Sequence, residues 1–85
     1  WDENIKEHFF KPLNMTTSTT VIDGLKNGKD AAFGYQVLSD SIIKKMDYYD
    51  IAAMGPAGSI NSSVTEMSNW AITWINGGKF QGKQI

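Results

Sequence analysis

Ser41 and Lys44 have the spacing of a catalytic motif, S-x-x-K, in which a lysine one helical turn away assists a serine nucleophile. The chemistry requires a helix, because positions i and i+3 share a face there, whereas in a strand they point to opposite faces. The motif follows a turn-forming pair, and both of its middle positions are β-branched, which favours a strand. We therefore interpret it as a chance match on a hairpin.

A glycine-rich run, Gly55-Pro56-Ala57-Gly58, precedes a predicted helix and could bind an anion through its backbone N–H groups. It lacks the G-K-[ST] sequence of a nucleotide-binding loop. Small and special residues cluster around it, so we favour a tight structural loop over residues 47–61, without regular structure and pressed against neighbouring chain.

One histidine and three tryptophans are the remaining candidates for chemistry or binding. His8 has no second histidine and no nucleophile beside it, so we expect a surface or half-buried side chain and not a base. Trp1, Trp70 and Trp74 could form a sugar-stacking platform. All three lie on predicted apolar helix faces, so packing in a core is the preferred interpretation.

Composition excludes several classes of function. The 85 residues carry a net charge of −1, with eight Lys and no Arg, which argues against a nucleic-acid surface or a polybasic membrane segment. There is no Cys and one His, so we expect no disulfide, no metal centre and no cofactor. The chain begins within a helical pattern and is small for an independent core. We therefore expect residues 1–85 to form a single fragment or subdomain of a larger domain.

The first half of the chain predicts one helix, a polar loop and a hairpin. Apolar residues at Trp1, Ile5 and Phe9 share one face of a helix over residues 1–10, which Pro12 should end by moving Lys11 out of the helical region. Residues 16–32 are rich in hydroxyl groups and glycine, so we expect a mobile surface loop with one helical turn at most. Alternation then predicts a β-hairpin over residues 33–46. Leu13, Asn14 and Met15 read as a turn with two apolar anchors, in which Asn14 takes left-handed geometry.

The strongest helix prediction covers residues 63–76. Ser63 and Glu66 form a capping-box pattern at its start, and Gly77-Gly78 should end it. Its apolar residues fall within one arc, which should face the core: Val64, Met67, Trp70, Ala71, Trp74 and Ile75. A short extended piece follows, with a turn at Gln81-Gly82. The fold class is therefore α+β, with two main amphipathic helices, a small antiparallel hairpin and long loops.

These apolar faces predict how the chain packs. We expect the two helices to pack together with the hairpin residues Phe33, Tyr35 and Val37. Some apolar surface should stay open, most of all at Phe10, Ile72 and Met54, and should cause weak self-association.

Four segments in series resemble motifs of serine β-lactamase-like proteins, a family that includes class C β-lactamases, D-alanyl-D-alanine carboxypeptidases and related esterases. Residues 10–15, FKPLNM, resemble F-x-P-L-G-M, and residues 32–35, AFGY, resemble a-x-G-Y. Residues 55–67, GPAGSINSSVTEM, resemble G-P-A-G-G-x-x-S-S-x-x-D-M, and residues 76–85 resemble N-G-G-K-y-x-G-K-q-i. The departures are Asn14 and Ser59 in place of Gly and Glu66 in place of Asp.

The resemblance implies a cleft-lining segment of a serine hydrolase that works through an acyl-enzyme. In that family the catalytic S-x-x-K and Y-x-N motifs precede this region and K-T-G or H-x-G follows it, so the resemblance gives this chain no catalytic residue. It places five residues along the substrate cleft: Gly55, Pro56, Ala57, Gly58 and Ser59. Class C enzymes often have Tyr at the position of Ala57, so Ala57 implies a wider wall.

Partners and location follow only from the resemblance. It implies that the rest of the β-lactamase-like domain is the partner, that the substrate is a β-lactam, a D-Ala-D-Ala peptide or an ester, and that the location is a bacterial periplasm or envelope. A stand-alone interaction or carbohydrate-binding module, using the aromatic residues, is the alternative.

Overall fold

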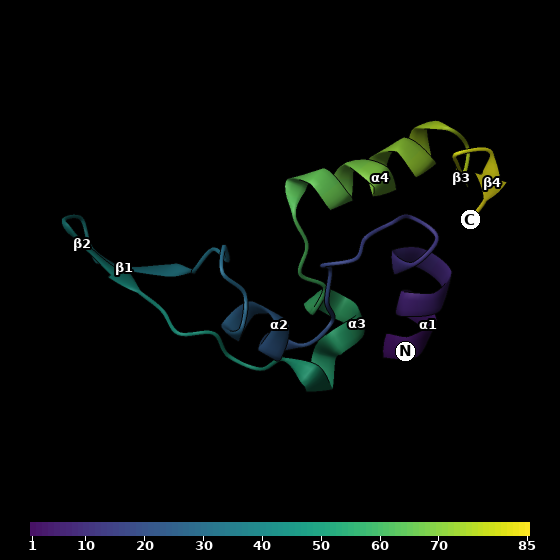
Figure 1. The fold of residues 1–85 in the computed structure, drawn as a ribbon. Coiled ribbons are helices and arrows are strands. Elements are labelled where there is room, and N and C mark those ends of the chain that lie inside the picture. The colour runs from purple at the N-terminus through teal and green to yellow at the C-terminus, as the bar shows by residue number, and fades with distance from the viewer.

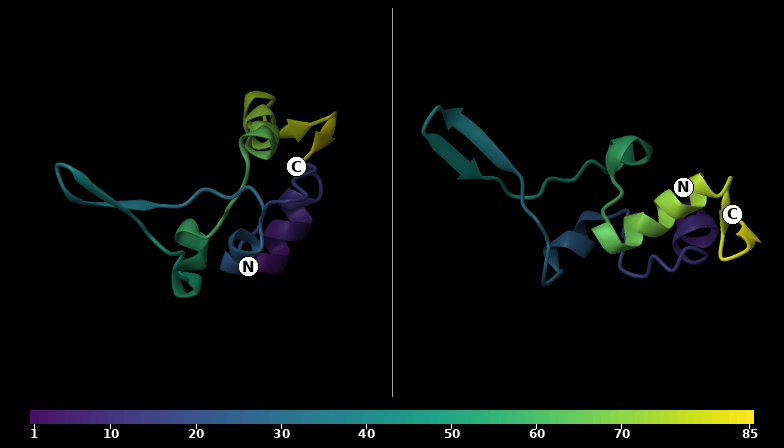
Figure 2. Two further views of the ribbon diagram at one scale, coloured as in Figure 1. Left: turned by 60° about the vertical axis from the view of Figure 1, so that its left-hand side comes forward. Right: turned by 90° about the horizontal axis from the view of Figure 1, so that it is seen from above.

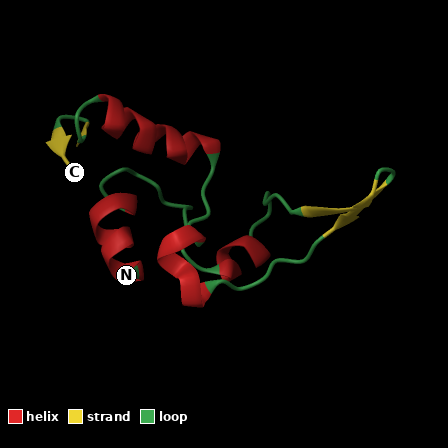
Figure 3. Ribbon diagram, turned by 180° about the vertical axis from the view of Figure 1, so that it is seen from behind, coloured by secondary structure: helices red, strands yellow, loops and turns green.

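The computed structural model describes all residues from Trp1 to Ile85 and has the α+β class that the sequence predicts. Helices and two small antiparallel hairpins alternate along the chain (Figure 1), in the order α1 (Asp2–Ile5), π-helical η1 (Lys6–Phe10), α2 (Ile22–Lys26), β1 (Tyr35–Ser39), β2 (Ile42–Lys45), 3-10 helix η2 (Ala52–Met54), α3 (Gly55–Gly58), α4 (Val64–Ile75), β3 (Lys79–Phe80) and β4 (Lys83–Gln84). Figure 3 shows the two hairpins at opposite ends of the molecule with the helices between them.

The first helix ends at Phe10, as the sequence predicts, but Lys11 after it keeps a helical backbone. Lys11 has helical dihedral angles, φ −65° and ψ −54°, and its N–H donates to the Lys6 carbonyl at 3.0 Å. The expectation that Pro12 forces Lys11 out of the helical region is therefore wrong. The i→i−5 bonds of η1 widen the last turn, which lets the chain reach Pro12 without the clash that a proline ring makes in a regular α turn. Asn14, at φ 56°, has the left-handed conformation predicted for it.

A small core lies between this helix, the turn after it, α4 and the β3–β4 hairpin. Its buried residues are Phe10, Leu13, Met15 and Phe80, with Ile5, Phe9, Trp70 and Ile85 packed against them. The prediction that Phe10 stays open is wrong, since only 6% of it is exposed. The wide π-helical turn holds more residues than an α turn, so Phe10 comes round to the side of Ile5.

The β1–β2 hairpin forms as predicted but does not pack on the helices. Tyr35 pairs with Lys45 and Val37 with Ile43, and the register shifts at a bulge between Val37 and Ser39. Every residue of both strands is exposed. Figure 2 shows the hairpin reaching away from the helices, which gives the molecule its 50 Å long axis. The expected packing of Tyr35 and Val37 against the two helices is therefore wrong.

An aromatic cluster at the base of the hairpin explains how it stands alone. The rings of Phe33 and Tyr48 stack with centroids 4.6 Å apart, and the Nζ of Lys45 lies 3.7 Å from the Phe33 centroid. The Tyr48 hydroxyl donates to the Ala32 carbonyl at 2.7 Å. These contacts join the two ends of the hairpin without using the helices.

Residues 47–61 contain two short helices, so the prediction of a segment without regular structure is wrong. Asp50 accepts a hydrogen bond from the backbone N–H of Ala52 at 2.8 Å, a local turn that leads into η2. Pro56 then stands in the first turn of α3, where its missing N–H costs nothing. The local hydrogen bond of Asp50 and the proline in the first turn of α3 therefore favour short helices, although small residues cluster in this segment.

The longest helix, α4, has the boundaries predicted for it, but it buries the opposite face from the one expected. The N–H of Glu66 donates to Ser63 Oγ at 3.2 Å, and Gly77 and Gly78 end the helix at φ 67° and 91°. The apolar arc is mostly exposed, at 87% for Val64 and 82% for Ile75, while the buried residues are Glu66 and Thr73. The expectation that the arc faces the core is therefore wrong for most of it. Trp70 packs on the core, and Met67 borders a hollow lined by core residues such as Phe10 and Met15.

Two further features complete the fold. The turn predicted at Gln81-Gly82 joins β3 to β4. The longest helix has 12 residues, and none is long and apolar enough to cross a membrane.

Candidate functional site

The five residues predicted to line a substrate cleft form α3 and the residue after it. Gly55 and Ser59 are buried, and Pro56, Ala57 and Gly58 are exposed. Both the N–H and the hydroxyl of Ser59 donate to the Gly55 carbonyl, each at 2.9 Å. The Ser59 hydroxyl therefore has a structural partner within its own turn.

The indole of Trp1 lies against the start of α3. A Cβ atom at Gly55 would lie 3.4 Å from Cζ3 of Trp1 and 3.4 Å from the Ser59 hydroxyl oxygen. These distances are at the short end of van der Waals contact, so the turn leaves little room for a side chain at position 55. The start of the chain thus packs directly on the candidate site.

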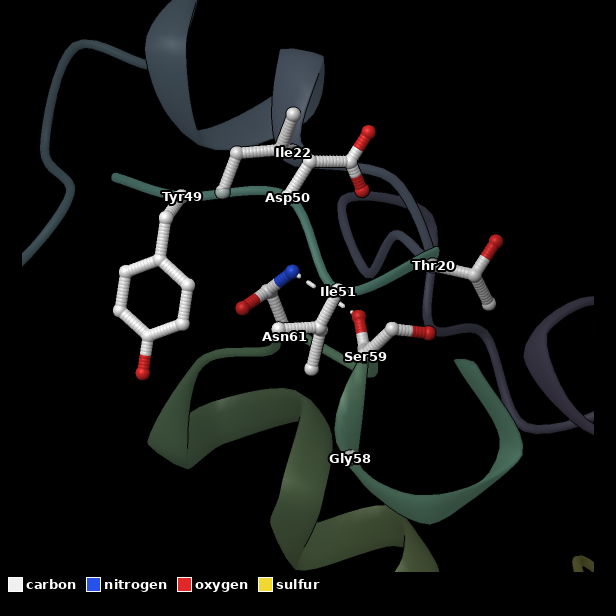
Figure 4. A pocket seen from close by; sticks show the side chains of 8 residues that line it. All are labelled: Thr20, Ile22, Tyr49, Asp50, Ile51, Gly58, Ser59 and Asn61. Carbon is white, nitrogen blue, oxygen red and sulfur yellow. Dashed lines mark hydrogen bonds between the residues drawn. The ribbon is translucent and has the colours of Figure 1, made fainter. Parts of the chain in front are cut away.

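A small hollow lies on one side of Ser59 (Figure 4). It has a volume of about 110 Å³ and is lined by Thr20, Ile22, Tyr49, Asp50, Ile51, Gly58, Ser59 and Asn61. Asn61 spans part of it by donating from Nδ2 to the Ser59 carbonyl at 3.0 Å. The hollow has room for a few water molecules and is smaller than the roughly 300–1,000 Å³ of a drug-sized ligand site.

A larger hollow, of about 340 Å³, adjoins the first and also borders Ser59. Its lining includes Trp1, Asp2, Thr20, Gly55 and Pro56, together with Val21, Ile22, Asp23, Asp50, Ala52 and Ser59. Four residues border both hollows, Thr20, Ile22, Asp50 and Ser59, whereas Ala57 borders neither. Three carboxylates take part in this lining, but no group of three or more His, Cys, Asp or Glu is arranged to hold a metal ion.

The most constrained ionisable group lies outside the predicted site, at Glu66. Its carboxylate accepts hydrogen bonds from the Thr17 N–H and the Thr17 hydroxyl, both at 2.8 Å, and from the Ser18 hydroxyl. Burial by itself raises the pKa of Glu66, but the hydrogen bonds from Ser18 and Thr17 outweigh it and lower the pKa below its ordinary value. The sequence pointed only to a local capping role, because nothing near Glu66 identifies a partner 49 residues away.

Glu66 ties down part of the segment expected to be a mobile loop. Thr19 and Asn61 exchange two backbone hydrogen bonds, at 3.0 and 2.8 Å, and Ser18 shares a hydrogen bond with Ser62 at 2.7 Å. Residues 17–19 are therefore fixed against the start of α4. Beyond them, one short helix, α2, forms, in line with the single helical turn expected there.

The other candidates have no catalytic geometry. Ser41 lies in the turn of the hairpin and Lys44 in β2, both exposed, so the predicted chance match on a hairpin is confirmed. His8 is exposed, as expected. The rings of Trp70 and Trp74 meet edge to face, 5.8 Å apart at 81°, which is no flat platform for a sugar.

Comparison with known proteins gives one relative. Over 78 residues the chain is 28% identical to beta-lactamase-like protein 1 of Dictyostelium discoideum, an alignment that covers 92% of this chain and 12% of that protein. No protein-family model matches the chain, and no solved structure matches it. The chain thus spans about one eighth of the length of the relative, which does not come from a bacterium. We conclude that the chain is distantly related to a β-lactamase-like protein.

Proposed function

We propose that the chain forms one wall of the substrate site in a serine β-lactamase-like hydrolase. The observation that carries the proposal is the similarity to a β-lactamase-like protein along 92% of the chain. The order of the four motif-like segments, from residues 10–15 to residues 76–85, adds to it.

In this proposal α3 is the part of the wall that meets substrate. Gly55 and Ser59 hold the turn in place from inside, through the Trp1 contact and the two hydrogen bonds to the Gly55 carbonyl. Ala57 presents a small side chain to the solvent between them. A short exposed turn on a buried anchor can fix the width of a substrate site without taking part in bond making.

The catalytic groups come from elsewhere in the proposed protein. Ser41 and Lys44 lie on an exposed hairpin, and the Ser59 hydroxyl is engaged with its own turn. The acyl-enzyme would form on a serine outside this chain, with a β-lactam, a D-Ala-D-Ala peptide or an ester as substrate. Location in a bacterial envelope remains a prediction from the resemblance.

The test compares this chain with a longer protein that contains it. Hydrolysis of nitrocefin, a p-nitrophenyl ester and a D-Ala-D-Ala peptide is measured for both. We expect turnover only by the longer protein, and we expect Ala57→Tyr to change the ratio of kcat/KM between nitrocefin and the small ester. Ser41→Ala is the control and should leave all rates unchanged.

Two results would overturn the proposal. One is turnover by the 85-residue chain that Ser41→Ala removes. The other is a longer protein with no S-x-x-K or Y-x-N sequence before this region, no K-T-G or H-x-G after it, and no hydrolysis of any of the three substrates.

A further inference from the structure

Two asparagines of the chain, Asn27 and Asn76, are followed directly by glycine. In such a pair the backbone nitrogen of the glycine can attack the side-chain carbonyl carbon of the asparagine, because glycine has no side chain to obstruct the approach. A C–N bond forms and closes a five-membered succinimide ring, while the bond to the side-chain nitrogen breaks and ammonia leaves. Water then opens the ring at either carbonyl, which gives an aspartyl or an isoaspartyl residue. Both positions therefore have the residues needed for deamidation.

Neither asparagine has the backbone conformation that the attack requires. The glycine nitrogen must turn toward Cβ of the asparagine, whereas both asparagines lie at the end of a helix, with ψ −4° at Asn27 and 21° at Asn76. The N–H of the next glycine is also engaged in each case, at 3.2 Å from the Leu25 carbonyl or from the Trp74 carbonyl. Each site therefore reacts only after the helix end opens locally, and the free energy of that opening controls the rate.

The end of α4, at Asn76, is held by contacts that reach the core. The Gly78 N–H donates to the carbonyl of the buried Thr73 at 2.8 Å, and the Gly78 carbonyl accepts from the Ile85 N–H at 2.9 Å. These bonds join the helix end to the β3–β4 hairpin, in which Phe80 is a core residue. Opening the chain at Asn76 therefore disturbs α4, this hairpin and the core together.

The end of α2, at Asn27, lacks such support. The helix has five residues, none of them buried, and a helix of this length gains little from its own hydrogen bonds. All residues from Lys26 to Asp30 are exposed. Gly28 borders an open hollow of about 650 Å³, so the chain has room to turn at this point. Opening the end of α2 should therefore cost less free energy than opening the end of α4.

We propose that Asn27 is a site of spontaneous deamidation in the folded chain, whereas the fold protects Asn76. The reaction needs no enzyme and no co-reactant except water, because the nucleophile is the backbone nitrogen of Gly28 and the leaving group is ammonia. The proposal does not depend on the proposed hydrolase function, since neither asparagine belongs to the predicted substrate wall.

The modification changes the surface beside the start of α4. It adds one negative charge to a chain whose net charge is −1, and the isoaspartyl product also lengthens the backbone by one carbon. The new carboxylate lies at the carboxyl end of α2, where the unpaired carbonyl groups of a helix disfavour an anion. Ser62 and Ser63 line the same hollow as Gly28. Deamidation should therefore loosen α2 and make this hollow more negative.

Peptide mapping by mass spectrometry tests the site. The folded chain is kept in mildly alkaline buffer, and samples taken over time are digested so that the two asparagines fall in different peptides. We expect Asn27 to deamidate at least about tenfold faster than Asn76, which corresponds to a difference of about 1.4 kcal/mol in opening free energy. An isoaspartyl methyltransferase should label the Asn27 peptide. Asn27→Gln should abolish the early acidic form of the chain, because a longer side chain disfavours ring closure, and Asn76→Gln should leave its appearance unchanged.

The same measurement in guanidinium chloride is the matched control, because it removes the fold and keeps both Asn-Gly pairs. In the denatured chain the two asparagines should react at similar rates. Three results would overturn the proposal. Asn76 could react as fast as Asn27 in the folded chain, or Asn27 could stay intact there for a time that modifies it in guanidinium chloride. The third is a preference for Asn27 that is equally large in both conditions, which would mean that neighbouring residues and not the fold select the site.

Discussion

The carboxylate of Glu66 accepts two hydrogen bonds from Thr17, one from the backbone N–H and one from the hydroxyl, each 2.8 Å long. The two residues are 49 positions apart, and their contact joins the first turn of α4 to the segment that follows the N-terminal helix. The same junction contains the Thr19–Asn61 backbone pair. The fold has few buried apolar residues, so the hydrogen bonds of Glu66 to Thr17 and Ser18, which we call the polar clip, help to hold its longest helix in place.

Replacing Glu66 should loosen this clip. Glu66→Gln keeps the shape of the side chain and removes its charge and one acceptor oxygen, so we expect the free energy of unfolding to fall by about 1–3 kcal/mol. Urea denaturation followed by tryptophan fluorescence measures the loss. Glu3→Gln is the control, because the Glu3 side chain is 80% exposed and pairs only loosely with Lys6 at 3.7 Å. Equal losses in the two variants would show that the Glu66 contacts contribute nothing.

The lowered pKa of Glu66 predicts a loss of stability in acid. Burial opposes ionisation, but the hydrogen bonds from Ser18 and Thr17 keep the pKa in the folded chain below its value in the unfolded chain. Stability from this group is therefore fully present above the unfolded pKa, about 4.3, and disappears as the pH falls through the lower folded pKa. Urea midpoints measured from pH 6 to about pH 2.5 should show the decline. In Glu66→Gln the same titration should be flatter, and a profile as steep as that of the parent would contradict this assignment.

Local sequence signals predicted both ends of α4 and the turn at Asn14, although they missed the short helices η2 and α3. Ser63 starts α4, Gly77 and Gly78 end it, and Asn14 takes the left-handed turn, because in each case one residue type supplies a specific hydrogen bond or dihedral angle. The β1–β2 hairpin could be predicted for the same reason, since alternation and turn chemistry lie within a few residues. None of these needs information from elsewhere in the chain.

Long-range contacts decided what the sequence could not predict. The side of α4 that faces inward depends on Thr17 and Ser18, which have no periodic relation to Glu66, so the apolar arc pointed to the wrong face. Phe10 is a core residue because of the wide π-helical turn, and no residue near it in the sequence indicates such a turn. The candidate site shows the same limit: the contact between Gly55 and Trp1 joins residues too far apart for a local motif to reveal.

The cap of α4 gives a prediction at the level of a single hydroxyl group. Ser63→Ala removes the acceptor for the Glu66 N–H and should lower the free energy of unfolding by about 0.5–2 kcal/mol. Thr65→Ala, two positions along, removes an exposed hydroxyl and should cost little. Urea melts of both variants measure the difference. Similar losses would mean that the helix begins at another residue.

Two tryptophans on the same helix allow the core to be tested against the surface. Trp70 packs on the core and meets the Phe9 ring edge to face at 5.4 Å, whereas Trp74 is 70% exposed. Trp70→Ala should therefore cost about 3–5 kcal/mol, a large part of the stability of so small a domain. Trp74→Ala should cost about 1 kcal/mol or less, mainly through its edge contact with Trp70. Urea denaturation at low protein concentration, followed by far-ultraviolet circular dichroism, keeps contacts between copies out of the comparison. A larger loss for Trp74→Ala than for Trp70→Ala would mean that the apolar arc of α4, and not its Glu66 side, faces the core in solution.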